Sequence, residues 1–429
     1  MNRIRPITFK KSINDIFIGG CSLKDLGHTY GTPLYILDEA TIRFNCQQFT
    51  NILTEHYPNY TIAYASKAGL NIGISNLIAS EGIGADVVSG GELYTVLKSN
   101  IDPQSVYFHG NNKSVQELEM AIEHNIRIVV DNQHELHQIQ AIAESKQKKA
   151  LIMFRIKPGI EAHTHEYIKT GHIDSKFGLS FSETLPLISS VHQSNWGTFI
   201  GIHSHIGSQI FDITPYYDLI AILVQFVETI YQELNIDVPE LNCGGGFGIQ
   251  YTPSDDAPDV SDIILKMATE LKLLCDAKKR PRPKIIFEPG RSIIANAGVT
   301  LYSIGGSKQV EGGTHYLFID GGMADNPRPM MYQSEYTFDI VHPSSDHQTT
   351  YTIAGKFCES GDILAKNVTL PTANPNDHLV VYGTGAYNYS MASNYNRFCK
   401  PAMVLVNQGE PRLIIKRETY EDIIRYDVQ

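Results

Sequence analysis

The chain has 429 residues, of which 42% are hydrophobic and 19% are charged. This composition excludes an intrinsically disordered chain and a small disulfide-stapled scaffold, and the length is sufficient for two or more domains with large buried cores. Lys and Arg number 35 against 46 Asp and Glu, which gives a net charge of -11. That charge disfavours binding to nucleic acid or to an anionic membrane surface.

The six cysteines are widely spaced and form no CxxC pair, so we expect reduced thiols. Residues 1–15 are basic, but no apolar stretch of signal-peptide length follows them. The most apolar run, at 219–231, is interrupted by Gln225 and Glu228. We therefore expect a cytoplasmic protein.

From residue 60 to about residue 290, short β-branched runs alternate with amphipathic stretches in which apolar residues recur every three or four positions. Helices are predicted at 71–82 and 212–234. The predicted strands are 60–65, 83–88, 105–109, 127–131, 151–156, 199–203, 239–243 and 284–287. Eight strands that alternate with helices are typical of a (β/α)8 TIM-like barrel, an α/β fold whose chemistry lies at the C-terminal ends of the strands.

From about residue 297 onward, short alternating runs are separated by Gly, Pro, Asn and Asp, as is typical of antiparallel β structure. A strand-like segment at 32–38 (TPLYILD) is expected to join them. The predicted strands lie within 298–306, 314–322, 349–355, 377–383, 401–408 and 411–418. The sequence therefore predicts a barrel domain of residues 38–290 and a β domain of residues 1–37 and 291–429.

Side chains able to do chemistry follow the predicted barrel strands, which suggests a functional site at the mouth of the barrel. They are, in chain order, Lys67, Asp86, His109, Asp131, Arg155, His205, the triplet 244–246 and Glu288. Lys67 alone could be an ordinary surface lysine. Directly after an apolar first strand, however, it points into the barrel mouth, where partial desolvation lowers the pKa of a lysine and allows it to form a Schiff base.

Two further motifs allow more than one interpretation. The segment GGGFG at 244–248 could be an ordinary turn, but its glycines let backbone N–H groups approach a phosphate, and barrels of this kind often bind phosphate there. His203 and His205 could be a metal pair or satisfied core residues. We favour a planar His205 against a flat cofactor, with the Ser208 hydroxyl at its phosphate, and we expect no metal. Together these features predict a site for pyridoxal phosphate.

Eight motifs resemble those of the fold-type III pyridoxal-phosphate-dependent decarboxylases, which share an alanine racemase-like architecture, and among them those of the diaminopimelate decarboxylases. The motifs are YASKA, GADVVSGGEL, TGHIDSKFG, HSHIGSQ, NCGGGFG, EPGRSIIANAG, CESGD and GAYNYSMASNYN, between residues 64 and 396. The resemblance implies that Lys67 forms the Schiff base, His205 stacks on the pyridine ring and Glu288 pairs with the pyridine nitrogen. It also implies cofactor contacts from Asp86, Ser208, Gly245, Gly246, Gly290, Arg291 and Tyr387.

The resemblance further implies the substrate and the catalytic proton donor. A distal carboxylate of the substrate would be held by basic and phenolic groups, its distal ammonium by Glu359, and the carbanion would be protonated by Cys358. The implied substrate-binding residues are Arg291, Arg328, Tyr332, Glu359 and Tyr387. The expected reaction is the decarboxylation of meso-2,6-diaminopimelate at its D-centre to L-lysine and CO2. The family also implies a homodimer, in which CESGD reaches the site of the neighbouring subunit.

Alternatives remain open for several of these assignments. Cys358 could be a buried structural cysteine, and Tyr387 one more aromatic residue of the β domain. The chain reads DNPRP at 325–329 where the family commonly has DLIRP, and RFCKP at 397–401 where the family has RPRP. The alternative substrates are a siderophore precursor, D-lysine or D-ornithine. CESGD disfavours an alanine racemase, and the β domain disfavours a non-catalytic pyridoxal-phosphate-binding barrel.

Overall fold

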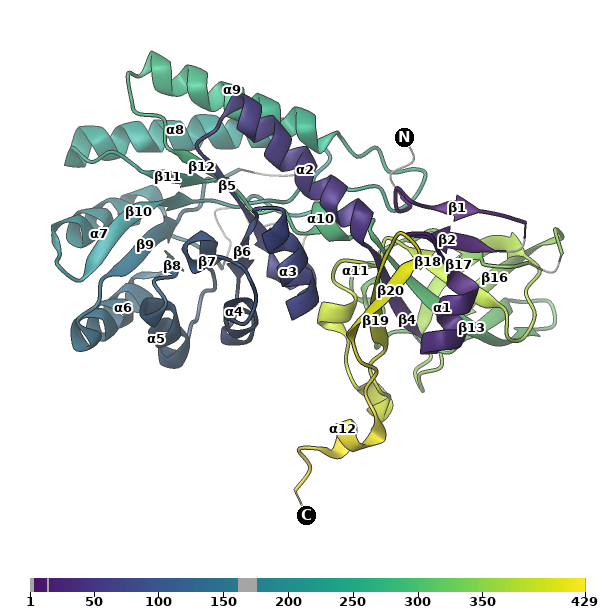
Figure 1. Cartoon of the computed structure of the whole chain (residues 1–429). Coiled ribbons are helices and arrows are strands. Elements are labelled where there is room, and N and C mark those ends of the chain that lie inside the picture. Colours follow the sequence, from purple (N-terminus) through teal and green to yellow (C-terminus); the bar gives the residue numbers. More distant parts are fainter. Residues whose placement is uncertain (1–3, 14, 161–175, 344, 429) are drawn as a thin grey trace. The chain divides into compact units, whose positions relative to one another are not determined.

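The computed structural model describes residues 4–13, 15–160, 176–343 and 345–428. Residues 170–175 of the TGHIDSKFG motif lie outside the described residues. The chain folds as two compact units, whose elements are labelled in Figure 1. The β unit comprises Met1–Phe44, Ile249–Asp256 and Ile293–Gln429, and the barrel unit comprises Asn45–Gly248 and Ala257–Ser292.

In the described part of the barrel unit, eight parallel strands close into a barrel in the order β10-β11-β12-β5-β6-β7-β8-β9. The strands are β5 (Tyr60–Ala65), β6 (Gly84–Val87), β7 (Val106–Phe108), β8 (Arg127–Val130), β9 (Ala150–Arg155), β10 (Gly197–His203), β11 (Glu240–Asn242) and β12 (Lys284–Phe287). Each strand overlaps a run predicted from the sequence, so the predicted barrel is confirmed. Consecutive strands are neighbours around the barrel, which brings their C-terminal ends to one rim.

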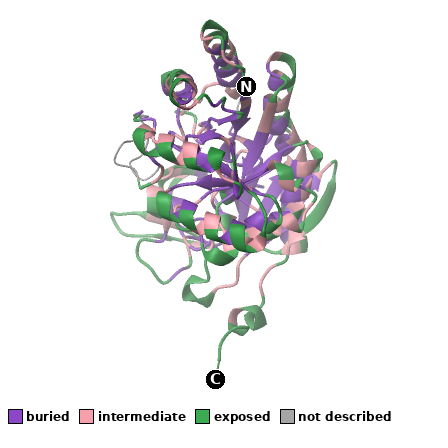
Figure 2. Cartoon of the chain, turned by 90° about the vertical axis from the view of Figure 1, so that its left-hand side faces the viewer, coloured by how far each residue is buried: buried purple, intermediate pink, exposed green. Residues whose placement is uncertain are grey.

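Helices cover the outside of the strands, which Figure 2 shows as largely buried. They are α2 (Glu39–His56), α3 (Ile72–Ser80), α4 (Gly90–Leu97), α5 (Val115–Glu123), α6 (Gln133–Lys146), α7 (Phe181–Gln193), α8 (Thr214–Leu234), α9 (Val260–Ala277) and α10 (Arg291–Ile294), with the short turns η1 (Ser66–Ala68) and η2 (Pro103–Ser105). The side chains of Ser89, Ser114 and Asn132 accept backbone N–H groups at the starts of α4, α5 and α6. These caps fix where each helix begins and so fix the strand-end residues just before it.

The β unit is built on a mostly antiparallel sheet of order β17-β16-β14-β13-β4-β19-β20, in which β18 also pairs with β13 and β15. Its strands are β4 (Leu34–Asp38), β13 (Gly298–Gln309), β14 (His315–Ile319), β15 (Phe338–Ile340), β16 (Gln348–Ala354), β17 (Ile363–Pro371), β18 (His378–Tyr382), β19 (Ala402–Asn407) and β20 (Glu410–Ile415). β4 pairs antiparallel with β13 and parallel with β19, so the predicted N-terminal strand does join this unit. The strands β15 and β17 are not among those predicted from the sequence.

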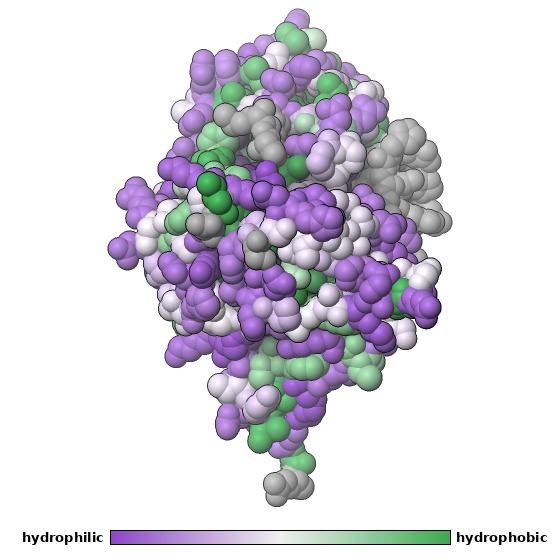
Figure 3. Space-filling model, turned by 90° about the vertical axis from the view of Figure 1, so that its right-hand side faces the viewer, coloured by the Kyte–Doolittle hydropathy of each residue, from purple (hydrophilic) through white to green (hydrophobic). Residues whose placement is uncertain are grey.

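Smaller elements complete the β unit. They are a three-stranded sheet of β1 (Lys10–Lys11), β2 (Ile16–Ile18) and β3 (Cys21–Ser22), the helices α1 (Leu23–Tyr30), α11 (Arg328–Tyr332) and α12 (Tyr420–Ile424), and the turns η4 (Tyr389–Met391) and η5 (Tyr395–Arg397). Hydrophobic side chains appear on the C-terminal tail in Figure 3, where Ile424 and Val428 are 58% and 96% exposed. No helix among the described residues has both the length and the apolar composition that crossing a membrane requires.

Candidate active site

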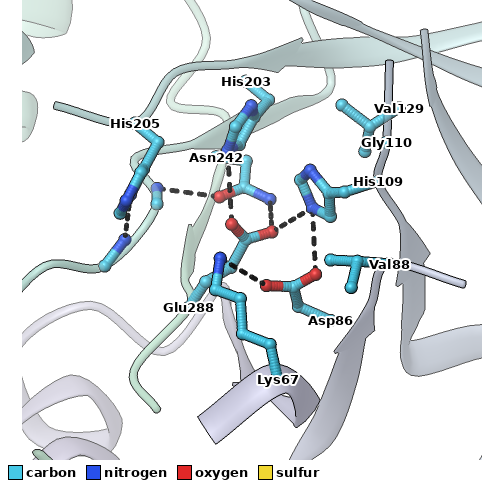
Figure 4. A network of polar contacts seen from close by, with 12 residues as sticks. Lys67, Asp86, Val88, His109, Gly110, Val129, His203, His205, Asn242 and Glu288 are labelled. Carbon is cyan, nitrogen blue, oxygen red and sulfur yellow. Dashed lines mark hydrogen bonds and ion pairs between the residues drawn. The ribbon is translucent and has the colours of Figure 1, made fainter. Parts of the chain in front are cut away.

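The C-terminal ends of the barrel strands carry a connected group of polar side chains (Figure 4). Lys67 lies in η1, directly after β5, and its Nζ is 4.0 Å from Oδ2 of Asp86 in β6. The Lys67 side chain is 44% exposed, whereas that of Asp86 is 3% exposed. The amine is therefore accessible to a ligand, while the carboxylate beside it is buried.

Glu288 follows β12, and three side chains at the ends of other strands contact its carboxylate. His109 Nε2 lies 2.7 Å from Oε1, Asn242 Nδ2 donates to the same oxygen at 2.6 Å, and His203 Nε2 lies 3.2 Å from Oε2. Burial alone would raise the pKa of Glu288, but His109 and His203 more than offset burial and hold the pKa well below its usual value. Glu288 is therefore an ionised carboxylate inside the barrel.

Asp86 has the opposite tendency. Burial raises the pKa of Asp86, and the nearby His109 and Lys67 offset this rise only in part. The two buried carboxyl groups thus differ in their readiness to take up a proton. Neighbouring carboxyl groups whose pKa values are pushed apart are typical of sites that carry out proton chemistry.

The two histidines of the segment HSH contact different groups. His203 lies against Glu288, and burial lowers its pKa to about 3. His205 Nδ1 accepts a hydrogen bond from the backbone N–H of Gly245 at 3.2 Å. Burial, together with Lys67 and Arg155, lowers the pKa of His205 well below its usual value. His205 is therefore a neutral flat ring, which suits stacking against a flat cofactor.

Glycines make room around these groups. A Cβ on Gly245 would lie 2.1 Å from the carbonyl oxygen of Glu288, and a Cβ on Gly290 would lie 2.8 Å from Cβ of Ala65. Gly246 has a φ of +98°, a conformation that favours glycine. The loops after β11 and β12 therefore approach each other through backbone alone.

The residues at the barrel mouth fit pyridoxal phosphate. They offer an accessible amine, an ionised carboxylate for a protonated ring nitrogen, a neutral planar ring, and a glycine-lined cradle. Arg291, the first residue of α10, donates from Nη2 to Oγ of Ser208 at 3.0 Å, which provides polar groups of the kind that a phosphate needs.

We expect Gly245→Ala to weaken the binding of pyridoxal phosphate, because the new Cβ overlaps the Glu288 carbonyl and displaces the loop. Overpacking of ~1–3 kcal/mol corresponds to about a 5- to 150-fold rise in Kd. An absorbance titration of the cofactor-free chain measures this change. Gly91→Ala on α4 is the matched control, because the nearest atom to its new Cβ is 3.8 Å away. Equal cofactor affinities for the two variants would show that the cradle is not needed.

In the β unit, Arg328 is buried among tyrosines. Its Nη1 donates to the hydroxyls of Tyr251 and Tyr336 at 3.1 and 3.0 Å, and its guanidinium carbon is 5.9 Å from the centre of the Tyr387 ring. The residue is 7% exposed, and no carboxylate in the described part of the chain pairs with it. A buried cation that lacks a counter-charge is suited to bind an anionic group of a ligand.

The structure shows local contacts at both departures from the family motifs. Pro327 precedes α11, and its carbonyl accepts from the backbone N–H of Met330 at 3.2 Å. Proline is tolerated at a helix start, where a backbone N–H has no helical partner, so Arg328 begins a short helix. In the second departure, Phe398 packs edge-on against Phe357 with ring centres 5.0 Å apart.

Cys358 and Glu359 lie between β16 and β17. Cys358 is exposed, which argues against a buried structural cysteine, and its backbone N–H donates to Oδ1 of Asn396 at 2.9 Å. The Tyr395 hydroxyl donates to Oε2 of Glu359 at 3.3 Å. The segment SNYN therefore supports the segment CESGD. Tyr332, at the end of α11, is half-buried.

Sequence reasoning gave no role to several residues that the structure places in these groups. His109 was visible as one of the strand-end residues, but its contact with Glu288 was not. Asn242 ends β11 directly before Cys243 and the glycine triplet, a position that could have identified it. No sequence pattern distinguishes Tyr251 and Tyr336 from the other tyrosines of the chain, which number 23 in all.

Known proteins resemble both the sequence and the structure. Residues 39–295 match the family model for the pyridoxal binding domain of pyridoxal-dependent decarboxylases. A diaminopimelate decarboxylase of Synechocystis sp. is 48% identical over 96% of this chain and 90% of its own length, and one of Bacillus subtilis is 42% identical over 96% and 94%. The crystal structure of diaminopimelate decarboxylase from M. jannaschii in co-complex with L-lysine has a TM-score of 0.92 at 34% identity and covers 100% of this chain and 99% of that chain.

Proposed function

The chain belongs to the diaminopimelate decarboxylase family of pyridoxal-phosphate-dependent enzymes, and we propose that the residues at the barrel mouth and around Arg328 carry out its reaction. The enzyme decarboxylates meso-2,6-diaminopimelate to L-lysine and CO2 in lysine biosynthesis. We assign the carboxylate lost to the D-centre of the substrate.

Lys67 would be the covalent anchor of the cofactor in this proposal, because its amine is accessible at the barrel mouth. His205 would lie against the ring of the cofactor, and Glu288 would hold the proton on its ring nitrogen. When bound, the cofactor takes up the electron pair left by the departing carboxylate. The phosphate and the remaining cofactor contacts are assigned to Asp86, Ser208, Gly245, Gly246, Gly290, Arg291 and Tyr387. The observation that carries the proposal is the buried, ionised Glu288 with His109, Asn242 and His203 around it, because such a carboxylate keeps the ring nitrogen protonated.

We assign the distal carboxylate of the substrate to Arg328. The side chain is buried with two tyrosine hydroxyls and no paired carboxylate among the described residues. A carboxylate of the substrate supplies the missing counter-charge through two parallel hydrogen bonds. A decarboxylase whose substrate is a diamino acid without a distal carboxylate, such as ornithine, does not need this arginine. The other substrate contacts are assigned to Arg291, Tyr332, Glu359 and Tyr387, with Glu359 at the distal ammonium.

Cys358 donates the proton that replaces the lost carboxylate. Cysteine is one of the side chains that transfer protons to or from a reacting group. The exposure of Cys358 supports this role, because an exposed thiol is accessible to a substrate that is bound by residues outside the CESGD segment.

We propose that the protein is a homodimer with shared sites and that it lies in the cytoplasm. Cys358 and Glu359 are exposed, and the C-terminal tail exposes the large side chains of Tyr420 and Tyr426, as a surface that meets a second subunit would. The free cysteines support a reducing compartment. The net charge of -11 supports the expectation of no nucleic-acid or membrane partner.

Mixing two inactive variants tests the proposed roles and the shared site together. Lys67→Ala removes the anchor and Cys358→Ala removes the proton donor, so a mixed dimer keeps one intact site if Cys358 serves Lys67 of the partner subunit. Random exchange of subunits should restore about a quarter of wild-type lysine formation, because about half of the dimers are mixed and each has one of two sites intact. An inactive mixture in which light scattering and labelled subunits show exchanged dimers would contradict the shared site.

A further inference from the structure

His109 lies between two buried carboxyl groups in the barrel unit (Figure 4). Its Nε2 is 2.7 Å from Oε1 of Glu288 and 3.7 Å from Oδ1 of Asp86. All three side chains are almost completely buried. Within the described part of the chain, His109 contacts both carboxyl groups and so connects them.

The backbone fixes the position of the His109 imidazole on both sides. The backbone N–H of His109 donates to the carbonyl of Val87 at 2.8 Å, which ties it to β6. The carbonyl of the next residue, Gly110, accepts from Nζ of Lys113 at 2.8 Å, and the same ammonium donates to the carbonyl of Val129 at 2.8 Å, which ties the segment to β8. The segment that carries His109 is therefore held by β6 and β8, the strands on either side of β7.

Two ionised carboxylates cannot share a water-poor interior unless a cation or an N–H donor compensates them; otherwise one takes up a proton. The Lys67 side chain is 44% exposed and its Nζ lies 4.0 Å from Asp86, whereas His203 lies 3.2 Å from Glu288 and packs against the ring of His109. The titratable and charged groups around the pair are Lys67, Glu92, Tyr107, His109, Asp131, Arg155, His203, His205 and Cys243. Among these, His109 has the shortest contact with Glu288, at 2.7 Å, and the same ring nitrogen also lies 3.7 Å from Asp86.

We infer that His109 is a positioning residue that keeps Glu288 ionised and aimed at the cofactor's ring nitrogen, and leaves Asp86 as the carboxyl group that takes up a proton. The inference rests on the proposed placement of Glu288 beside that nitrogen. Without His109, Glu288 shares a proton with Asp86 and holds the ring-nitrogen proton for only part of the time. The defect grows as the pH falls, because acid populates the protonated pair.

Cofactor affinity as a function of pH tests this inference without relying on turnover. The cofactor-free chain is titrated with pyridoxal phosphate between about pH 6 and about pH 8.5 as wild type, His109→Ala, His109→Gln and the control His137→Ala, an exposed position on α6. The ratio of Kd for His109→Ala to Kd for wild type should rise up to about tenfold per pH unit as the pH falls. His109→Gln keeps an N–H donor and should give a smaller, flatter ratio. A ratio that does not change with pH indicates a structural role only and overturns the inference.

Two further measurements separate this inference from the proposal on which it rests. In the holoenzyme, the acid limb of the kcat profile should move upward by about one pH unit in His109→Ala. Glu288→Gln should lower cofactor affinity throughout the pH range. Wild-type affinity in Glu288→Gln overturns the placement of Glu288, whereas a defective Glu288→Gln beside a wild-type pH profile in His109→Ala overturns the role of His109 alone.

Discussion

Lys67→Ala is expected to lose lysine formation and the visible absorbance of the lysine-linked cofactor together. The Lys67 amine is the accessible nitrogen at the barrel mouth, 4.0 Å from Asp86, and alanine offers nothing that can bond to the cofactor or exchange with the substrate amine. We expect kcat to fall by at least about 10³-fold. Absorbance spectra after dialysis and a lysine assay on the same sample measure both effects.

Two companion variants separate this chemistry from folding. Lys67→Arg keeps a positive charge beside Asp86 but has no primary amine, so it should also be inactive. Lys149→Ala removes an exposed lysine just before β9 and should behave as wild type. A Lys67→Ala protein that remains coloured and active after dialysis would remove Lys67 from the mechanism.

Arg328→Leu should change which substrate the enzyme prefers. Two charge-assisted hydrogen bonds of ~1.5–3 kcal/mol each are lost with the guanidinium, which corresponds to about a 10²- to 10⁴-fold fall in kcat/KM for meso-diaminopimelate. D-Lysine lacks the distal carboxylate, so its kcat/KM should change little. CO2 release from meso-diaminopimelate, D-lysine and D-ornithine measures this difference.

Two control variants accompany Arg328→Leu: a change at another arginine and a conservative change at Arg328 itself. Arg412→Leu on β20 removes an exposed arginine from the same unit and should leave kcat/KM unchanged. Arg328→Lys keeps the charge but not the paired geometry, so it should fall between wild type and leucine. If Arg328→Leu lowers kcat/KM equally for all three substrates, Arg328 does not recognise the distal carboxylate. If the wild type prefers D-lysine or D-ornithine, the substrate assignment is wrong.

Most of the strands follow from local sequence, because β-branched runs bounded by turn residues specify them without long-range information. β17 is the informative exception. Its buried and exposed positions do not alternate regularly, Asn367 within it has a φ of +57°, and its pairing with β16 shifts register between Tyr351 and Ala354. No period-two pattern therefore marks this strand, and β15 is too short at three residues to produce one.

In the site, too, the sequence predicts some features and not others. Positions at strand ends, such as Lys67 and Glu288, follow from the barrel pattern, because that fold places them on one rim. Contacts across the barrel do not, since His109 and Glu288 are 179 residues apart and meet only once the strands close. The polar partners of Arg328, Tyr251 and Tyr336, come from loops with no distinctive pattern.

Product formation by the cofactor-free chain should depend on added pyridoxal phosphate. The account predicts that meso-diaminopimelate gives L-lysine and CO2 in equal amounts only when the cofactor is added. It also predicts that Lys67→Ala gives neither product under the same conditions. The absence of lysine from the wild type with cofactor present, or equal lysine formation after verified removal of the cofactor, would contradict the account.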